Sequence, residues 1–228
     1  MAVADLHGQA AAATCTEIAR AGGTALPLLG DVRRTADVEA WVARTQENLG
    51  PVSVLVNNAG LQHVSPVHEF GEEEWRRLLD VMLTGPFLCI RAVLPGMLDA
   101  GWGRIVNLGS IHSLVASPYK SAYVAAKHGL LGLTRTVALE TAGRGITVNC
   151  LCPAYVRTPL VENQLPELAA RHGLAVDEVV EQVLMPAMPL GRMLEPAEVA
   201  EAVLFLCSPS AAGITGTALP LDGGWTAR

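Results

Sequence analysis

Short apolar runs alternate along the chain with longer segments in which apolar residues recur every three or four positions. The short runs are typical of buried strands, and the longer period is typical of helices packed on a core. The pattern predicts strands at 1–5, 24–29, 52–56, 104–109, 146–151 and 217–221. It predicts helices at 8–21, 34–49, 72–100, 121–142 and 196–207, with a bend at Pro86 in the third helix.

Strands that alternate with helices at this spacing imply right-handed βαβ crossovers. We therefore predict an α/β fold with a Rossmann-like, doubly wound parallel sheet in three αβα layers. Residues 1–228 form a single domain in this prediction. Residues 154–195 have a looser pattern and several prolines, so we expect a mobile flap over the strand ends and not a separate domain.

Composition narrows the classes of protein that fit. The net charge of -6 argues against a nucleic-acid or anionic-membrane partner. No apolar run is expected to reach the roughly 18 residues of a membrane span. The five cysteines form no C-x-x-C pair and no zinc spacing with histidine, so we expect no metal site and core thiols in a reducing cytoplasm. Cys150 and Cys152 alternate on a predicted strand, which puts both on one buried face.

The stretch 110–127 carries the candidate chemistry. Tyr123 and Lys127 lie four residues apart, so they share one face of a helix. A phenol beside an ammonium, with the Ser110 hydroxyl delivered from a strand end, can move a proton to or from an alcohol oxygen. We expect the Lys127 charge to lower the pKa of Tyr123 from its ordinary value near ~10. The alternative is an exposed Tyr–Lys pair and a serine that caps a turn.

Six motifs extend this hypothesis over the whole chain. They are G-D-V at 30–32, N-N-A-G at 57–60, Ser110, Y-x-x-x-K at 123–127, C-P-A-Y-V-R-T-P at 152–159 and D-G-G-W at 222–225. In this order they resemble the short-chain dehydrogenases/reductases. The resemblance implies hydride transfer with a nicotinamide cofactor, Tyr123 as general acid/base, Ser110 orienting the substrate oxygen and Lys127 also binding the nicotinamide ribose. It further implies a homotetramer built through the long helices and the C-terminal segment.

The same resemblance assigns the cofactor site. The residues implied are Asp5, Asp31, Val32, Asn57, Ala59, Gly60, Tyr123, Lys127, Pro153, Val156 and Thr158, with Cys152 beside Pro153. Asp5 ends the first strand, where an acid repels a 2′-phosphate, so we expect NAD and not NADP. The alternative role for Asp5 is a cap for the helix that begins at Gly8.

One family element has no counterpart in the sequence. A dinucleotide-binding sheet begins with a strand, a Gly-rich turn and a helix whose N-terminus holds the pyrophosphate. No G-x-G-x-x-G cluster precedes residue 22. We expect the first βα unit to be missing, two sheet edges to be left open, and the natural form to start further upstream.

Part of the chain is also similar to the bacterial 3-hydroxybutyrate dehydrogenases, on 58–66, 110–129, 156–164 and 214–228. That similarity implies that a small carboxylate is held by Gln62, His112, Lys120 and Gln164, beside Ser110 and Tyr123. Tyr155 and Trp225 would wall the pocket. One departure is Met82, which stands where the family usually has an asparagine of a proton relay.

The leading hypothesis is an NAD-dependent oxidoreductase that interconverts a small 3-hydroxy acid and its 3-oxo acid. One alternative is a reductase of another substrate, such as a 3-oxoacyl thioester or a sugar. It is favoured if Gln62, His112, Lys120 and Gln164 point to separate surfaces. The other alternative is a non-catalytic scaffold that cannot bind NAD, supported by the absent Gly-rich turn.

Overall fold

The structure is a computed structural model that describes residues 1–227. Its strands are β1 (Ala2–Asp5), β2 (Leu26–Leu29), β3 (Val54–Asn57), β4 (Gly103–Leu108), β5 (Ile146–Pro153) and β6 (Ala218–Leu221). Its longer helices are α1 (Gly8–Arg20), α2 (Thr35–Leu49), α3 (Glu72–Leu79), α4 (Gly85–Ala100), α5 (Ser121–Glu140) and α9 (Pro196–Cys207). All strand pairs are parallel, which confirms the predicted α/β class.

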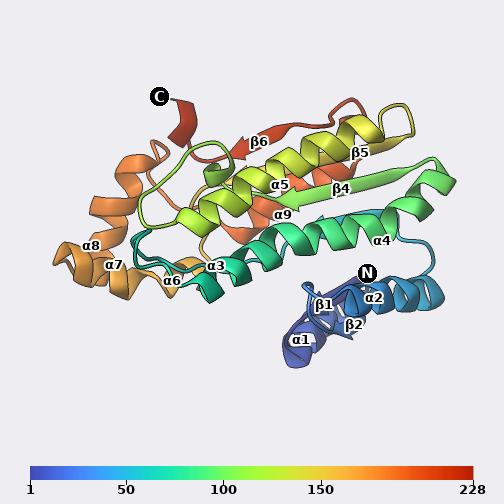
Figure 1. Cartoon of the computed structure of the whole chain (residues 1–228), viewed down its shortest axis with the longest axis horizontal. Coiled ribbons are helices and arrows are strands. Elements are labelled where there is room, and N and C mark those ends of the chain that lie inside the picture. Colours follow the sequence, from blue (N-terminus) through green and yellow to red (C-terminus); the bar gives the residue numbers. More distant parts are fainter. Residues whose placement is uncertain (228) are drawn as a thin grey trace.

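The main sheet has the strand order β3-β4-β5-β6 and lies between two helical layers. Helices α4 and α5 cover one face and α9 covers the other (Figure 1). Ile105 and Val148 oppose one another in the β4–β5 register and pack against Met97 of α4. Leu206 of α9 packs on the opposite face of the same strands. The sheet therefore presents the carboxyl ends of β3, β4 and β5 along one edge.

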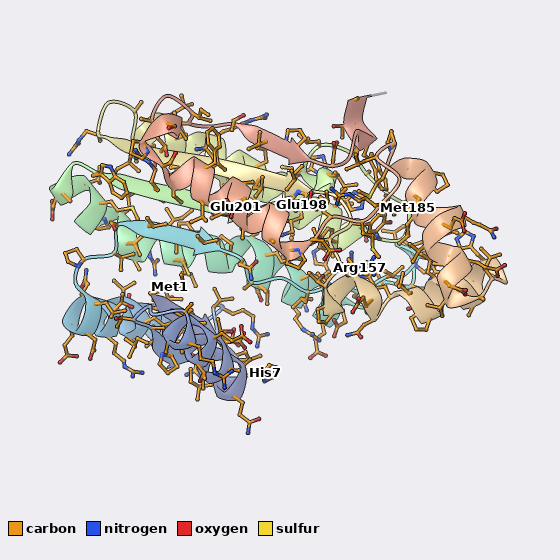
Figure 2. All side chains as sticks on the ribbon, turned by 180° about the vertical axis from the view of Figure 1, so that it is seen from behind. Met1, His7, Arg157, Met185, Glu198 and Glu201 are labelled. Carbon is orange, nitrogen blue, oxygen red and sulfur yellow. The ribbon has the colours of Figure 1, made fainter. Side chains whose placement is uncertain are left out.

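The prediction of a single sheet is wrong in one respect, because β1 and β2 form a separate two-stranded sheet. With α1 and α2 they make a block beside the main sheet (Figure 1), and Met1 and His7 lie in that block in Figure 2. Among the described strands, β1 pairs only with β2, and β3 pairs only with β4. The block is joined through Val38 of α2, which packs against Leu88 of α4. One edge of β1 and one edge of β3 are thus left without a strand partner.

Helix α4 follows α3 without a break, although a proline lies at its start. The residues between them, Asp80–Thr84, form a π-helical turn. The Gly85 N–H donates to the carbonyl of Asp80, one residue further back than in an α-helix. The predicted bend at Pro86 therefore takes the form of a widened turn, which accommodates a residue that has no N–H to donate.

The continuous helix Glu72–Ala100 is long and apolar enough to span a membrane by length and composition alone. This finding corrects the expectation that no segment would be long and apolar enough to span a membrane. Core helices of soluble proteins can have the same length and hydropathy, and this helix packs Ile90, Val93 and Met97 against the main sheet. It is a core helix of this fold.

Residues 154–195 contain more regular structure than their sequence pattern predicts. They form short helices α6 (Pro159–Glu162), α7 (Leu165–His172) and α8 (Val176–Val179), followed by a π turn at Val180–Leu184 and a 3₁₀ turn at Met185–Ala187. A small apolar cluster centred on Leu165, Val179 and Leu184 holds these pieces together. Arg157, which Figure 2 labels, pairs at 3.3 Å with Glu195, the residue before α9. The segment lies over the carboxyl-end edge of the sheet (Figure 1).

Candidate active site

Ser110 is fixed at the carboxyl end of β4 by close packing behind it. A side chain at Gly109 would place its Cβ 2.5 Å from Sγ of Cys150, so only glycine fits there. The Ser110 Oγ accepts a hydrogen bond from the backbone N–H of His112 at 3.2 Å, and the Ser110 N–H donates to Ser113 Oγ at 3.3 Å. Because the Oγ accepts from the backbone, its own hydrogen stays free to donate.

Tyr123 and Lys127 lie on the first turns of α5, as their spacing predicts. The Lys127 side chain is 5% exposed, and its Nζ donates to the backbone carbonyl of Leu108 at 2.6 Å. The same Nζ lies 5.6 Å from the centre of the Tyr123 ring. The Tyr123 ring also meets the His112 ring edge-on, at 5.9 Å between centroids. The serine, tyrosine and lysine therefore belong to one cluster.

Burial sets the proton affinities in this cluster. It raises the pKa of Tyr123, and a hydrogen bond to Ser110 opposes the rise. It lowers the pKa of Lys127 to about 8. The expectation that Lys127 would bring the tyrosine pKa below its ordinary value is therefore wrong for this structure, because desolvation of the buried phenol outweighs the opposing hydrogen bond to Ser110. At neutral pH Tyr123 holds its proton and can act as an acid.

A small pocket opens in front of these groups, with a volume of about 60 Å³. All six residues expected to bind substrate line it: Gln62, Ser110, His112, Lys120, Tyr123 and Gln164. They come from the loop after β3, the turn after β4, the start of α5 and the residue before α7. Tyr155 also lines the pocket, whereas Trp225 is not among the lining residues and contacts the Tyr155 ring at 5.6 Å between centroids.

The two basic residues of the pocket differ in charge. Burial, and then the charge of Lys120, lower the pKa of His112 to about 4. His112 is therefore neutral near pH 7, and its Nδ1 is buried with no hydrogen-bond partner among the described residues. Burial also lowers the pKa of Lys120, whose Nζ lies 5.8 Å from the centre of the Tyr155 ring. Positive charge in the pocket thus comes from the lysine, and the histidine contributes a neutral ring.

A buried polar chain lies behind the site, and of its three residues only Asn57 was predicted from the sequence. Asn57 at the end of β3 donates from Nδ2 to Oδ1 of Asn107 at 2.8 Å, and Asn107 donates to Oγ1 of Thr134 at 2.9 Å. These contacts tie β3 and β4 to α5. The signal in the sequence was Asn107, a single amide inside the otherwise apolar end of its strand.

Met82, at the expected relay position, is 0% exposed and packs against Ala122 and Ala126 of α5. It lies in the π turn Asp80–Thr84. Its thioether supports the helix that carries Tyr123 and offers no useful hydrogen bond.

The residues expected to bind the nicotinamide half of a cofactor lie along the same sheet edge. Pro153 ends β5, Val156 forms a bridge with Leu194, and Thr158 precedes α6. Ala59 and Gly60 are exposed in the loop after β3. With Lys127, these groups fit a nicotinamide riboside, because they surround the carboxyl ends of neighbouring parallel strands.

The residues expected to bind adenosine lie in or next to the separate β1–β2 block. Asp5 accepts a hydrogen bond from the His7 N–H at 2.7 Å, just before α1. Its alternative role as the cap of that helix is wrong, because His7 occupies the N-cap position and no side chain caps the first turn. Asp31 is held by the Arg33 guanidinium, which lowers the pKa of that carboxyl. Val32 lies against the start of α4, beside Gly85. This half of the site fits less well, because no strand joins the block to the main sheet.

Comparison with known proteins agrees with this architecture. The model of a family described as enoyl-(acyl carrier protein) reductase matches residues 1–226. A D-beta-hydroxybutyrate dehydrogenase of Rhizobium meliloti (strain 1021) is 45% identical over 206 residues, which cover 90% of this chain and 80% of the relative. A second enzyme of that name, from Cupriavidus necator, is 41% identical over 214 residues, covering 93% of this chain and 83% of the relative.

Among solved structures, a gluconate 5-dehydrogenase from Burkholderia cenocepacia J2315 in complex with NADP and tartrate superposes with a TM-score of 0.89. It is 30% identical, and the match covers 100% of this chain and 85% of that one. The chain belongs to the short-chain dehydrogenase/reductase family. It is an oxidoreductase of that family, whose members use nicotinamide cofactors.

Proposed function

We propose that the protein interconverts a small 3-hydroxy acid, of the size of 3-hydroxybutyrate, and its 3-oxo acid, with NAD as cofactor. The observation that carries this proposal is the convergence of Gln62, His112, Lys120 and Gln164 on one pocket with Ser110 and Tyr123. A volume of about 60 Å³ suits a small acid better than a sugar or an acyl thioester.

The charge of the pocket supports a carboxylate substrate. Lys120 supplies a partly desolvated ammonium, and the amides of Gln62 and Gln164 supply neutral donors on either side. In the free protein Gln164 Nε2 donates to the carbonyl of Leu160, and Gln62 Oε1 accepts from the His63 N–H. One N–H donor of Gln164 and both N–H donors of Gln62 are therefore still available for a ligand.

The proton chemistry follows from burial. The bound cofactor would supply or accept the hydride. In reduction, Tyr123, held in its protonated form by its raised pKa, donates its proton to the carbonyl oxygen. Ser110 donates a hydrogen bond to the same oxygen as negative charge develops there. In oxidation Tyr123 must first release its own proton; the phenolate, next to the Lys127 ammonium, then accepts the alcohol proton and becomes the phenol again.

NAD is favoured over NADP by Asp5, a carboxylate at the end of β1 that would repel a 2′-phosphate. Lys127 and Asn57 to Gly60 would hold the nicotinamide ribose, and Pro153, Val156 and Thr158 the amide and diphosphate. Asp31 and Val32 would meet the adenine.

The second candidate function is that of a scaffold protein without catalytic activity. It is favoured by the unpaired edges of β1 and β3, which separate the adenosine residues from the main sheet. Titration of NAD into the protein by calorimetry discriminates the two. We expect weak but saturable binding, because no strand joins the adenosine residues to the main sheet. Tight binding would contradict this view of the open edges, and no detectable binding would favour the scaffold.

We also propose a cytoplasmic homotetramer. Large apolar side chains stay exposed on the long helices and on α9, namely Phe87, Leu139, Leu204 and Phe205. Such patches are typical of interfaces between subunits. All five cysteines are free, as expected in a reducing compartment. Light scattering during gel filtration tests the assembly: a mass of four chains is expected, and it should fall on Leu204→Glu.

A further inference from the structure

A second, larger pocket lies at the opposite end of the main sheet from Ser110. Its volume is about 560 Å³, and it is bordered by the amino ends of β4 and β5 and by the turn after α9. Figure 1 shows the strand arrows pointing away from this end, toward α7 and α8. Trp102, Arg104, Ile146, Thr147, Pro209 and Ala212 are among the lining residues. None of them takes part in the chemistry proposed above.

Arg104 is the unusual member of this lining, because its guanidinium is buried without a counter-charge. The residue is 4% exposed. Its Nη1 donates to the carbonyls of Gly103 at 2.8 Å and Gly145 at 3.0 Å. Its Nε has no partner, its Nη2 makes no hydrogen bond within residues 1–227, and no carboxylate of those residues forms an ion pair with it. The edge left free is the Nε–Nη2 fork that binds an oxyanion through two parallel hydrogen bonds.

Thr147 supplies a second unused polar group beside that fork. It opposes Arg104 in the β4–β5 register, so the two side chains are neighbours on one face of the sheet. The residue is 5% exposed, and its Oγ1 is buried with no hydrogen-bond partner in the described chain. Buried polar groups are nearly always satisfied in folded proteins, so two adjacent exceptions among the residues that line one pocket call for a ligand.

Most of the remaining walls are apolar. The Arg104 guanidinium lies 4.6 Å from the centre of the Trp102 ring, and Ile146, Pro209 and Ala212 add apolar side chains, while Thr215 adds one further hydroxyl. A free phosphate would leave the apolar walls in contact with water. A carboxylate that carries a hydrocarbon chain would accept hydrogen bonds from the donors and also cover the apolar walls. The volume also lies within the range of about 300–1,000 Å³ that is typical of small-molecule sites.

We propose that this pocket binds an apolar carboxylate, such as a medium-chain fatty acid. The carboxylate receives two hydrogen bonds from the Nε–Nη2 edge of Arg104 and one from Thr147 Oγ1. The hydrocarbon chain lies along Trp102, Ile146 and Pro209.

Titration calorimetry with octanoate tests this proposal on the whole protein. Octanoate is expected to bind once per chain, and 1-octanol, which lacks the charge, more weakly. The Lys120→Met variant is expected to bind octanoate like the wild type, which separates this site from the smaller pocket at Tyr123. Equal binding of octanoate and octanol, or loss of binding in Lys120→Met, would overturn the proposal.

Two variants locate the site. Thr147→Val removes a hydroxyl that has no partner in the free protein, so it should fold normally and weaken octanoate binding about tenfold. Thr136→Val, on the exposed face of α5, is the matched control and should change nothing. Arg104→Met should abolish binding; if it fails to fold, because Nη1 holds two carbonyls, Thr147→Val decides alone. Unchanged affinity in Thr147→Val would overturn the proposal.

Discussion

The ammonium of Lys127 donates a hydrogen bond to the carbonyl oxygen of Leu108 at 2.6 Å, joining α5 to the end of β4. Ser110 follows Leu108 by two residues, and Tyr123 lies one helical turn before Lys127. A buried lysine therefore positions both groups proposed to handle the substrate oxygen. Its burial also lowers its own pKa to about 8, which makes the contact sensitive to pH.

The first prediction concerns stability at alkaline pH. The folded-state pKa of Lys127 lies below its ordinary value of 10.5, so the unfolded chain binds more protons between about 8 and 10.5. The contribution of Lys127 to the free energy of unfolding should therefore rise with pH across this window, by on the order of 3 kcal/mol. Urea unfolding of the wild type and Lys127→Met checks this. The difference between the two proteins should change across the window, and a constant difference would contradict the lowered pKa.

The second prediction concerns the proton donor. Tyr123→Phe keeps the ring that packs near His112 and Lys127 but removes the hydroxyl. Turnover of 3-hydroxybutyrate, followed by NADH absorbance at high NAD, should fall about 10²- to 10⁴-fold. Tyr119→Phe is the control, because Tyr119 is 48% exposed and does not line the smaller pocket. Full turnover in Tyr123→Phe would remove the proposed acid/base.

The third prediction separates the two basic residues of the pocket. Because the pKa of His112 lies at about 4, its ring stays neutral from about pH 5.5 to about pH 8. KM for 3-hydroxybutyrate should show no step assigned to His112 in that range, and His112→Gln should raise KM modestly. Lys120→Met should raise KM much more, because it removes the pocket's charge. A KM step near pH 6.5 that disappears in His112→Gln would show that the histidine titrates normally.

The fourth prediction concerns the packing behind Ser110. A Cβ at residue 109 would lie 2.5 Å from Cys150 Sγ and 2.8 Å from Ser113 Oγ. Gly109→Ala should therefore lower the free energy of unfolding by about 1–3 kcal/mol. The matched control is Gly132→Ala on α5, where nothing lies within 4 Å and the helix should gain up to about 1 kcal/mol. Equal stability of the two variants would contradict the tight packing at Gly109.

Regular periodicity and capping made much of the fold predictable. The helix Pro196–Cys207 has the predicted limits, since a proline at its first position and an apolar face both mark it. The π turn at Asp80–Thr84 had no such signal, because its backbone conformation is compatible with ordinary helical residues.

In the candidate site, spacing predicted that Tyr123 and Lys127 share a helix face, and the family resemblance predicted which other side chains would meet them. Neither predicted their protonation. The pKa values of Tyr123 and Lys127 depend on burial, and the exposed fraction of these side chains cannot be read from the sequence. The Arg104 pocket was equally hidden. It arises from the register that sets Arg104 opposite Thr147, which becomes known only when β4 and β5 are paired.

Direct binding of the substrate tests the central proposal, that the pocket at Tyr123 holds a small hydroxy acid by its carboxylate. Saturation-transfer NMR can compare 3-hydroxybutyrate with its methyl ester, with and without NADH. We predict a clear signal for the acid, a much weaker one for the ester, and loss of the acid signal in Lys120→Met. Equal signals for acid and ester, or an unchanged signal in Lys120→Met, would contradict the account.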